Sequence, residues 1–381
     1  MTRTGRDPWL LTPGPLTTSL TVKEAMLHDW GSRDRNFIDI NRRVRDRLVF
    51  LAGGEGTHVC VPLQGSGTFV VEATIGTLLP RDGKALILVN GAYGQRMTKI
   101  CDYYQRRYQV LETPEDVPND AVAVDVALGQ DAELSHVFVV HCETTSGILN
   151  PVAEIAQITA RHGRKLIVDA MSAFGAIPLD ARDVPFDAVV ASSNKCIEGV
   201  PGVGFAIVRS SLLARCEGNA PSLTLDLYDQ WQAMEKNAQW RFTPPTHVIV
   251  AFDQALREHE EEGGVAGRGG RYAHNCRTLV DGMRALGFET LLPDALQAPI
   301  IVTFHMPADP AFVFQTFYDS LGERGFVIYP GKLTVADSFR IGCIGRLGEK
   351  EIRAALEAIS ETLSEMGVTH CGPKHSDPVV A

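Results

Sequence analysis

The sequence has 381 residues, a formal net charge of −10, 45% hydrophobic residues and 22% charged residues. This composition is ordinary for a globular protein, and the negative charge, without a Lys/Arg block, argues against nucleic-acid binding. The length exceeds that of a usual single domain, so we expect one large and one small domain.

Neither terminal nor internal segments indicate a membrane or secreted protein. The N-terminus, MTRTGRDPWLLTPGP, lacks the apolar stretch of a signal peptide, and no apolar run reaches the length of a membrane span. The eight cysteines form no C-x-x-C pair, and the eleven histidines form no H-x-x-x-H pair. We therefore expect a cytoplasmic protein with reduced thiols and no metal site.

Short apolar runs alternate with amphipathic stretches from about residue 57 to 209. They predict strands at THVCVPL, KALILVN, HVFVVHCE, KLIVDA, FDAVVAS and VGFAIVRS, and helices at GTFVVEATIGTLL, AYGQRMTKICDYYQRR and NPVAEIAQITARHG. This alternation predicts an α/β fold with a mostly parallel sheet covered on both faces. Ligands of such sheets bind at the carboxyl ends of the strands, so the residues that follow each strand are the candidate binding residues.

The C-terminal third has its own pattern. Residues 210–270 are mixed, with two prolines in RFTPPTH, and EEEGGVAGRGGR (260–271) predicts a helix end and a hinge. A helix near 271–286, the strands PIIVTFHM, FVIYP and SFRIGCI, and the helices AFVFQTFYDSLGERG and EKEIRAALEAISETLSEMG then predict a small α/β domain. The predicted boundaries are 16–260 for the large domain, 271–367 for the small domain and 368–381 for a flexible tail.

Two strand ends carry residues suited to a phosphate and an aromatic ring. In QGSGT, Ser66, Gly67 and Thr68 stand at a helix N-terminus, where free N–H groups and the helix dipole favour phosphate; the motif alone is better explained as a tight turn with capping hydroxyls. In NGAYGQR, Tyr93 stands at the mouth of the sheet, where it can stack on a planar ring or pack on its own helix.

Three further turns carry carboxylates, hydroxyls and a lysine. HCETTSG offers Glu143, Thr144 and Thr145, which also suit helix capping. Asp169 ends an apolar strand, where a carboxylate needs a turn to cap or a cation such as a protonated pyridine nitrogen. Lys195 follows the next strand; alone it reads as a solvated charge, but partial desolvation would make its amine a nucleophile for a carbonyl. Together these residues supply the parts of a pyridoxal phosphate site.

The motifs resemble the fold-type I, class V family of pyridoxal-phosphate aminotransferases. The resemblance runs from residue 10 to 365 and rests on LLTPGPLTTS, HDWGSRD, PLQGSGTF, NGAYGQR, HCETTSGILNP, VDAMSAFGAIPLD, SSNKCIEGVPGVGF, RFTPPTH and FRIGCIGR. It implies a large domain with a mostly parallel seven-stranded sheet between helices, a smaller C-terminal α/β domain and pyridoxal 5'-phosphate as cofactor. It also implies a homodimer with shared active sites. Within the family the resemblance is greatest to enzymes that move the amino group of 2-aminoethylphosphonate to pyruvate, which implies these two small molecules as substrates.

The resemblance also assigns roles to individual residues. Lys195 corresponds to the lysine that forms the Schiff base, and Asp169 to the partner of the pyridine nitrogen. Arg340 corresponds to the arginine that binds the substrate acid, for which its planar fork is suited. The other implied contacts are Tyr93 on the ring, Ser66, Gly67, Thr68 and Asn194 at the cofactor phosphate, Thr145 or Thr144 near the ring's 3-oxygen, Thr243 at the phosphate in the other subunit, and Gly14 in an N-terminal segment, 1–15, that passes over the site.

The chain departs from the family pattern at two of these positions. Asn194 stands where the family often has Gln, which is a longer donor. Trp240 stands where some members have Tyr.

Three other functions remain open from the sequence. An alanine– or serine–glyoxylate (or pyruvate) aminotransferase of the same family would share these motifs, because an arginine binds either acid. A lyase of the cysteine desulfurase type needs a mobile cysteine loop and usually a histidine on the ring; here Tyr93 stands at the ring position and Cys343 lies in a strand pattern. A nucleotide-binding Rossmann module needs G-x-G-x-x-G after its first strand, which the sequence lacks.

Overall fold

The computed structural model describes residues 7–333 and 336–373. Its contacts divide the chain into a larger unit, Thr18–Glu143 with Leu149–Gly269, and a smaller unit, Met1–Thr17 with Thr144–Ile148 and Gly270–Ala381. Most of the flexible tail predicted for 368–381 falls on 374–381, which lies outside the described residues.

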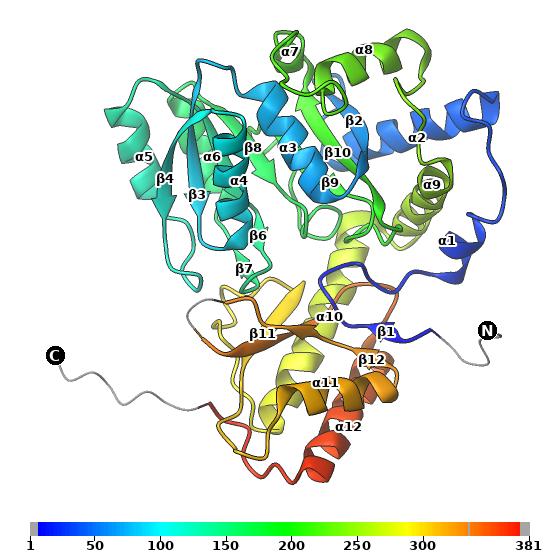
Figure 1. Ribbon diagram of the computed structural model, residues 1–381, viewed down its shortest axis with the longest axis vertical. Helices are drawn as coiled ribbons and strands as arrows, with labels where there is room; N and C mark the ends of the chain where they lie inside the picture. Colours follow the sequence, from blue (N-terminus) through cyan, green and yellow to red (C-terminus); the bar gives the residue numbers. More distant parts are fainter. Residues whose placement is uncertain (1–6, 334–335, 374–381) are drawn as a thin grey trace. The chain divides into compact units, whose positions relative to one another are not determined.

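A seven-stranded sheet forms the centre of the larger unit, in the order β2-β10-β9-β8-β5-β3-β4 (Figure 1). Only β10 runs antiparallel to its neighbours, β2 and β9, while the other strands of this sheet run parallel. The mostly parallel seven-stranded sheet expected from the resemblance is therefore confirmed. The strands are β2 (His58–Gly65), β3 (Lys84–Val89), β4 (Arg107–Glu112), β5 (Leu134–Val140), β8 (Lys165–Asp169), β9 (Ala188–Ser192) and β10 (Gly202–Arg209).

Helices cover both faces of this sheet because successive side chains of a strand point to opposite sides. In β3, Leu86 and Leu88 pack in a cluster with α2, α5, α6 and α9. Ala85, Ile87 and Val89 pack in a second cluster with α3, α4, α7 and α8. The helices of the larger unit are α1 (Leu20–Glu24), α2 (Arg35–Leu51), α3 (Gly67–Leu78), α4 (Ala92–Tyr103), α5 (Ala121–Gln130), α6 (Val152–Arg161), α7 (Ser210–Leu213), α8 (Leu227–Asn237) and α9 (Thr246–Glu261).

The smaller unit contains a three-stranded antiparallel sheet in the order β11-β14-β13. Phe339 of β14 lies at the centre of its core, with ring centroids 5.7 Å from those of Phe288, Phe304 and Phe317. This unit confirms the smaller α/β part of the predicted fold. Its elements, with the short strands of both units, are β1 (Trp9–Leu10), β6 (Cys142–Glu143), β7 (Ile148–Leu149), β11 (Ile301–His305), α11 (Phe314–Glu323), β12 (Phe326–Val327), β13 (Tyr329–Pro330), β14 (Ser338–Gly342) and α12 (Glu349–Met366).

The helix end predicted at 260–271 is confirmed, and the hinge predicted there stays a prediction. Helix α9 ends at Glu261, but α10 (Gly264–Ala285) begins three residues later and runs through the glycine-rich stretch into the smaller unit. Each glycine costs a helix about 1 kcal/mol relative to alanine. Tertiary packing outweighs this cost, since the side chains of Arg268 and Tyr272 are completely buried. Among the described helices, none is both long enough and apolar enough to cross a membrane.

Candidate active site

The predicted site residues of the larger unit follow neighbouring strands. β5, β8 and β9 are adjacent and parallel, with Asp169 paired to Val140 on one side and to Val190 on the other. The carboxyl ends of these strands therefore meet at one edge of the sheet, where Glu143, Asp169 and Lys195 follow them. The positive charge of Lys195 lowers the pKa of Asp169, which places the two side chains within electrostatic reach.

Asp169 is a buried carboxyl group, only 4% exposed, whose Oδ1 accepts a hydrogen bond of 2.9 Å from the N–H of Met171. Burial raises its pKa to about 6, and the negative charge of Glu143 acts in the same direction. The Met171 N–H and the charges of Arg96 and Lys195 oppose this shift. A cation placed against Asp169 would offset the cost of burying its charge, and a protonated pyridine nitrogen fits that requirement.

Lys195 is half-buried in a tight turn after β9. Its carbonyl oxygen accepts a hydrogen bond from Glu198 N at 2.7 Å, and Gly199 N donates to Ser193 O at 2.8 Å. The Ser193 hydroxyl closes the same turn by donating to Val200 O at 2.6 Å. These bonds hold the backbone of the lysine in one conformation.

Arg268 of α10 supports this turn and was missed by sequence reasoning. Its side chain is completely buried, its Nη1 donates to the carbonyl of Cys196, and its Nε donates to Glu262 at 2.7 Å. Nη1 also lies 3.6 Å from Oε1 of Glu198, a residue held in the left-handed region at φ 63°. An arginine in a glycine-rich stretch gives no sequence signal of burial, so only the tertiary structure identifies it.

The first turn of α3 provides donors for an anion. Ser66 is the N-cap in an extended conformation, and its hydroxyl makes no capping hydrogen bond. A Cβ on Gly67 would lie 2.4 Å from Sδ of Met171, so a larger residue here would require that flexible side chain to move. Thr68 Oγ1 accepts a hydrogen bond of 2.9 Å from Arg96. Free N–H groups at a helix N-terminus beside an arginine form a suitable cradle for a phosphate.

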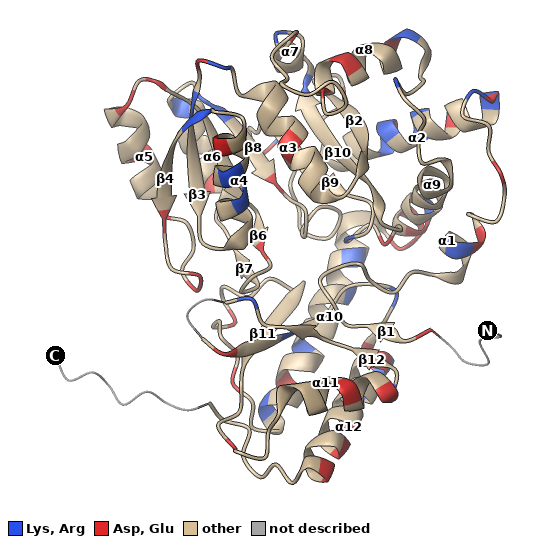
Figure 2. Ribbon diagram, in the orientation of Figure 1, with Lys and Arg blue, Asp and Glu red and all other residues tan. Residues whose placement is uncertain are grey.

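Tyr93 lies half-buried in the first turn of α4, and its N–H donates to Oε2 of Glu143 at 3.2 Å. The guanidinium carbon of Arg96 lies 4.8 Å from the centre of the Tyr93 ring. Figure 2 marks the basic residues of α4 along the ribbon of this helix. Asn194, beside the lysine, uses its Oδ1 to accept a hydrogen bond of 3.0 Å from Ser192.

The remaining predicted residues of this group, Thr144, Thr145, Gly14 and Arg340, belong to the smaller unit. Arg340 is 2% exposed, and its Nη1 donates to Thr144 O at 2.7 Å and its Nε to Pro330 O at 3.1 Å. These two bonds fix the plane of the guanidinium. Thr145 is completely buried, and Gly14 has φ 110°. Their contacts with cofactor or substrate stay predictions.

Thr243 lies exposed in the loop after α8. It borders a hollow of about 380 Å³ that Arg33 and Arg241 also line. Trp240, in the same loop, donates from Nε1 to Oδ1 of Asn41 at 3.0 Å. The role predicted for Thr243 in the other subunit stays a prediction.

In the part of the chain that the structure describes, the cysteines and histidines form neither a metal site nor an exposed reactive thiol. Within these ranges, three or more His, Cys, Asp or Glu side chains nowhere gather as a metal site requires. All eight cysteines are buried thiols, and burial raises the pKa of Cys142 well above its usual value. Cys343 is completely buried just after β14, which does not fit the exposed, mobile cysteine of a desulfurase.

Comparisons with known proteins identify the family of this chain. The family model "Aminotransferase class-V" matches residues 67–334. A Burkholderia lata protein named 2-aminoethylphosphonate–pyruvate transaminase 2 is 58% identical over 362 residues, which cover 95% of this chain and 96% of that protein. A Pseudomonas aeruginosa 2-aminoethylphosphonate–pyruvate transaminase is 56% identical over 368 residues, covering 97% and 99%.

The solved structures point to the same fold. The pyridoxamine–pyruvate aminotransferase from Mesorhizobium loti matches with a TM-score of 0.87 and 25% identity, covering 95% of this chain and 93% of that one. An alanine–glyoxylate aminotransferase from Nostoc matches with a TM-score of 0.87 and 21% identity, covering 95% and 97%. The chain belongs to the class V aminotransferase family.

Proposed function

We propose that this protein is a pyridoxal-phosphate-dependent transaminase that transfers the amino group of 2-aminoethylphosphonate to pyruvate, which yields phosphonoacetaldehyde and L-alanine. The single observation that carries this proposal is the lysine turn of the larger unit, because Lys195 follows the strand adjacent to the one that ends at the buried carboxyl of Asp169, and its charge lowers the pKa of that carboxyl. The substrate assignment rests on the names of relatives that are 56% and 58% identical along nearly the whole chain.

The residues present fit pyridoxal phosphate. Asp169 would hold the ring nitrogen in its protonated form, and Tyr93 would stack on the ring. The first turn of α3, with Ser66 and Thr68, would bind the phosphate together with Asn194. Thr145 would contact the 3-oxygen.

When bound, the cofactor supplies an electron sink that stabilises negative charge on the substrate carbon. Lys195 would take the proton from that carbon as a general base and would donate a proton, as a general acid, to the carbon that acquires the amino group. The fixed backbone of the lysine turn limits the positions that its amine can reach. Asp169, ionised while it faces a cation, would keep the ring nitrogen of the bound cofactor protonated. Arg340 orients the substrate acid, which is a phosphonate in the first half-reaction and a carboxylate in the second.

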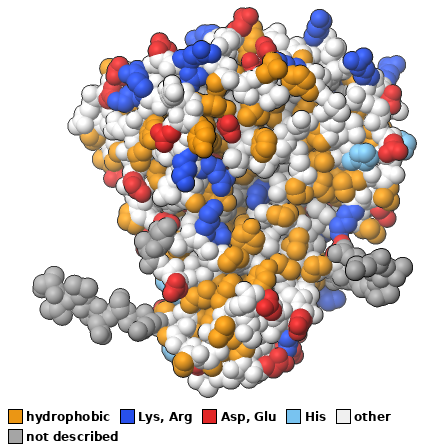
Figure 3. Space-filling model, viewed as in Figure 1, with side chains coloured by type: hydrophobic (Ala, Val, Ile, Leu, Met, Phe, Trp, Pro, Cys, Tyr) orange, Lys and Arg blue, Asp and Glu red, His pale blue; other side chains and the backbone are white. Residues whose placement is uncertain are grey.

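The overall charge does not help an anionic substrate to bind. The net charge is −10, and Figure 3 shows acidic and basic side chains mixed on the face in view. Attraction must therefore be local, and the buried guanidinium of Arg340 is suited to it because a buried charge is weakly screened. The eight buried thiols fit a reducing, cytoplasmic location.

A half-reaction tests the substrate. The holoenzyme is mixed separately with 2-aminoethylphosphonate, alanine and serine, and the absorbance of the bound cofactor is followed as it takes up the amino group. We expect conversion with 2-aminoethylphosphonate and with alanine, which is the amino product of the reversible second half. Conversion by alanine and serine without conversion by the phosphonate would instead identify an alanine– or serine–glyoxylate aminotransferase.

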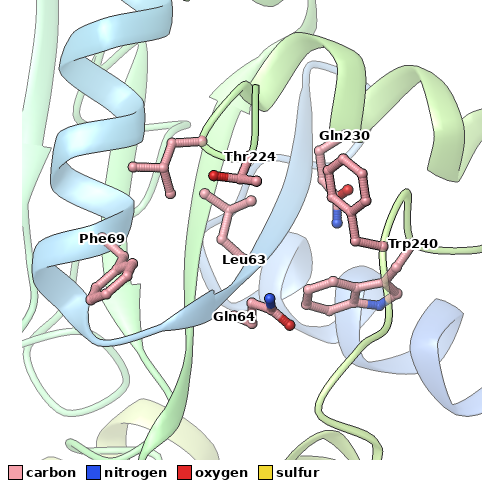
Figure 4. Close-up of a pocket in the computed structure, with 8 residues that line it drawn as sticks. Leu63, Gln64, Phe69, Thr224, Gln230 and Trp240 are labelled. Atoms are coloured by element: carbon pink, nitrogen blue, oxygen red, sulfur yellow. The ribbon is translucent and has the colours of Figure 1, made fainter. Parts of the chain in front are cut away.

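We also propose a homodimer with shared active sites. A hollow of about 210 Å³ lies beside β2, and Leu63, Gln64, Phe69 and Trp240 line it (Figure 4). Exposed apolar side chains surround it, with Phe69 49% and Phe242 46% exposed. A second copy of the chain would cover this apolar surface. Thr243, one residue beyond Phe242, would then reach the cofactor phosphate of the other subunit.

Mixed dimers test this sharing. Lys195→Ala subunits and Thr243→Val subunits are inactive or weakened alone, but a mixed dimer contains one site with both native residues. We expect activity to rise when the two variants are refolded together, towards half of the wild-type value per mixed dimer. Activity that remains the sum of the two separate preparations would refute shared sites.

A further inference from the structure

Glu143 is a carboxylate with no exposed surface at the end of β6, directly after the central strand β5. Burying a carboxylate is costly unless hydrogen bonds and opposite charges compensate it. The proposed reaction assigns it no role. The contacts of Glu143 therefore indicate its structural role.

The first contact of Glu143 is with helix α4. Its Oε2 accepts a hydrogen bond of 3.2 Å from the N–H of Tyr93, in the first turn of that helix. The N-cap of α4 is Gly91, which has no side chain to cap the helix. A Cβ on Gly91 would lie 2.5 Å from Cδ of Glu143, so the glycine leaves room for the carboxylate. Glu143 thus replaces the missing N-cap from another part of the chain, where its charge also complements the helix dipole.

The second relation of Glu143 is electrostatic. Its charge helps burial to raise the pKa of Asp169, whereas Arg96 of α4 and Lys195 after β9 lower it. The two segments are also joined directly, because the N–H of His141, two residues before Glu143, donates to the carbonyl oxygen of Asp169 at 2.8 Å. Two buried carboxylates, from β6 and β8, therefore lie in one region with two cations nearby. Besides these four groups, Asp169 accepts a hydrogen bond from the N–H of Met171. The thiol of Cys142, the neighbour of Glu143 in β6, stays uncharged because burial raises its pKa.

We infer that Glu143 is a positioning residue, whose carboxylate anchors the first turn of α4, with Tyr93 in it, and adds a second buried negative charge beside Asp169. This inference rests on the proposed function, in which Tyr93 stacks on the cofactor and Asp169 pairs with the ring nitrogen. A cationic cofactor ring then faces two negative charges, and its aromatic platform is held by the same carboxylate that supplies one of them.

Two variants separate the two roles. Glu143→Gln keeps the length and an acceptor oxygen for the Tyr93 N–H but removes the charge. Glu143→Asp keeps the charge but is one methylene shorter, so it no longer reaches that N–H. Glu72→Gln is the matched control, because Glu72 is a carboxylate of α3 that accepts a hydrogen bond from the Tyr104 hydroxyl at 2.8 Å, outside the proposed site.

The charge is tested on the cofactor complex. In Glu143→Gln we expect the Kd for pyridoxal phosphate to rise about tenfold. The pH at which the absorbance of the bound cofactor changes should fall, because loss of a nearby negative charge disfavours the protonated, cationic form. Glu72→Gln should keep both values near those of the wild type, and Glu143→Asp, which keeps the charge, should keep the pH midpoint. Wild-type cofactor affinity and an unchanged pH midpoint in Glu143→Gln would overturn the charge role.

The anchor is tested on protein without cofactor, by amide hydrogen exchange in the first turn of α4. We expect exchange in this turn to be about tenfold faster in Glu143→Asp than in the wild type and nearly unchanged in Glu143→Gln. Wild-type exchange in Glu143→Asp would overturn the anchoring role. A wild-type protein that binds no pyridoxal phosphate would refute the proposed function instead, and the exchange measurement would still decide the anchor.

Discussion

The two units of this chain carry their candidate functional groups in different ways. In the larger unit, Asp169 and Lys195 lie at or beyond the ends of parallel strands, where side chains leave the sheet. In the smaller unit, Arg340 lies within β14, paired with Thr303 on one side and Tyr329 on the other. A parallel sheet thus gathers groups from several strands at one edge, while an antiparallel sheet fixes a single group by its register.

Because of this difference, we expect mutations in the two units to change different steps of the reaction. Substitutions in the larger unit should change the chemical step and the cofactor spectrum. Substitutions at Arg340 should change substrate binding and leave the cofactor spectrum as it is.

The largest effect is expected for Lys195→Ala. Removal of the amine takes away the proposed general base and acid, so we expect kcat to fall by about 10⁴-fold and the absorbance of the bound cofactor to change. Rapid-mixing kinetics of the half-reaction measure both. Lys165→Ala is the control, because Lys165 is at the opposite end of β8 and pairs with Asp187 at 3.3 Å. If the kcat of Lys195→Ala stays within tenfold of the wild-type value, Lys195 of the larger unit is not the general base and acid of the reaction.

An intermediate effect is expected for Arg340→Lys. The ammonium keeps the charge but loses the planar fork and the bonds to the carbonyls of Thr144 and Pro330, so kcat/KM should fall about 30- to 100-fold for both substrates. We expect most of the loss in KM, with an unchanged cofactor spectrum. Arg346→Lys, at an exposed site of the same unit, is the control. A loss confined to kcat would contradict the assignment of substrate binding to Arg340 and of the chemical step to the larger unit.

The smallest effect is expected in the stability of the apoprotein carrying Asp169→Asn. The pKa of Asp169 is raised to about 6 in the folded protein. The protonated carboxyl group therefore contributes to the free energy of unfolding below the ordinary carboxyl pKa, and this contribution is lost as the pH rises to about 6. Above that pH the buried charge costs about 2–3 kcal/mol, which Asn removes. Thermal unfolding at pH 7.5 should therefore show a more stable variant, with slower catalysis once cofactor is added. An apoprotein that Asp169→Asn destabilises would mean that Lys195 and Arg96 already compensate the charge.

Sequence patterns predicted the central strands because β3, β5, β8 and β9 are buried on both faces and read as continuous apolar runs. They did not predict β4, an edge strand with the mixed sequence RYQVLE, or α5, whose mixture of alanine and valine shows little amphipathic contrast. The helix α9 was also missed, since the prolines before it directed attention to irregular structure.

Among the site residues, those that follow strands were identified from the sequence, because a polar residue after an apolar run is visible as a pattern. In the sequence, Glu143 is only one member of a polar turn, and Arg268 lies in a glycine-rich stretch that gives no signal of burial. Both act through residues far from them in the chain, Glu143 on Tyr93 and Arg268 on Cys196. No local pattern encodes such contacts.

The sequence by itself determined the alternation of strands and helices, and with it the sheet edge at which Asp169 and Lys195 meet, because hydrophobic periodicity is a local property. Only the tertiary structure decided which charges are buried together. The burial of Glu143 beside Asp169, and of Arg268 behind the lysine turn, depends on side chains from other segments excluding water. Burial is a property of the packed molecule, and it controls both the pKa of Asp169 and the strength of the charges that surround it.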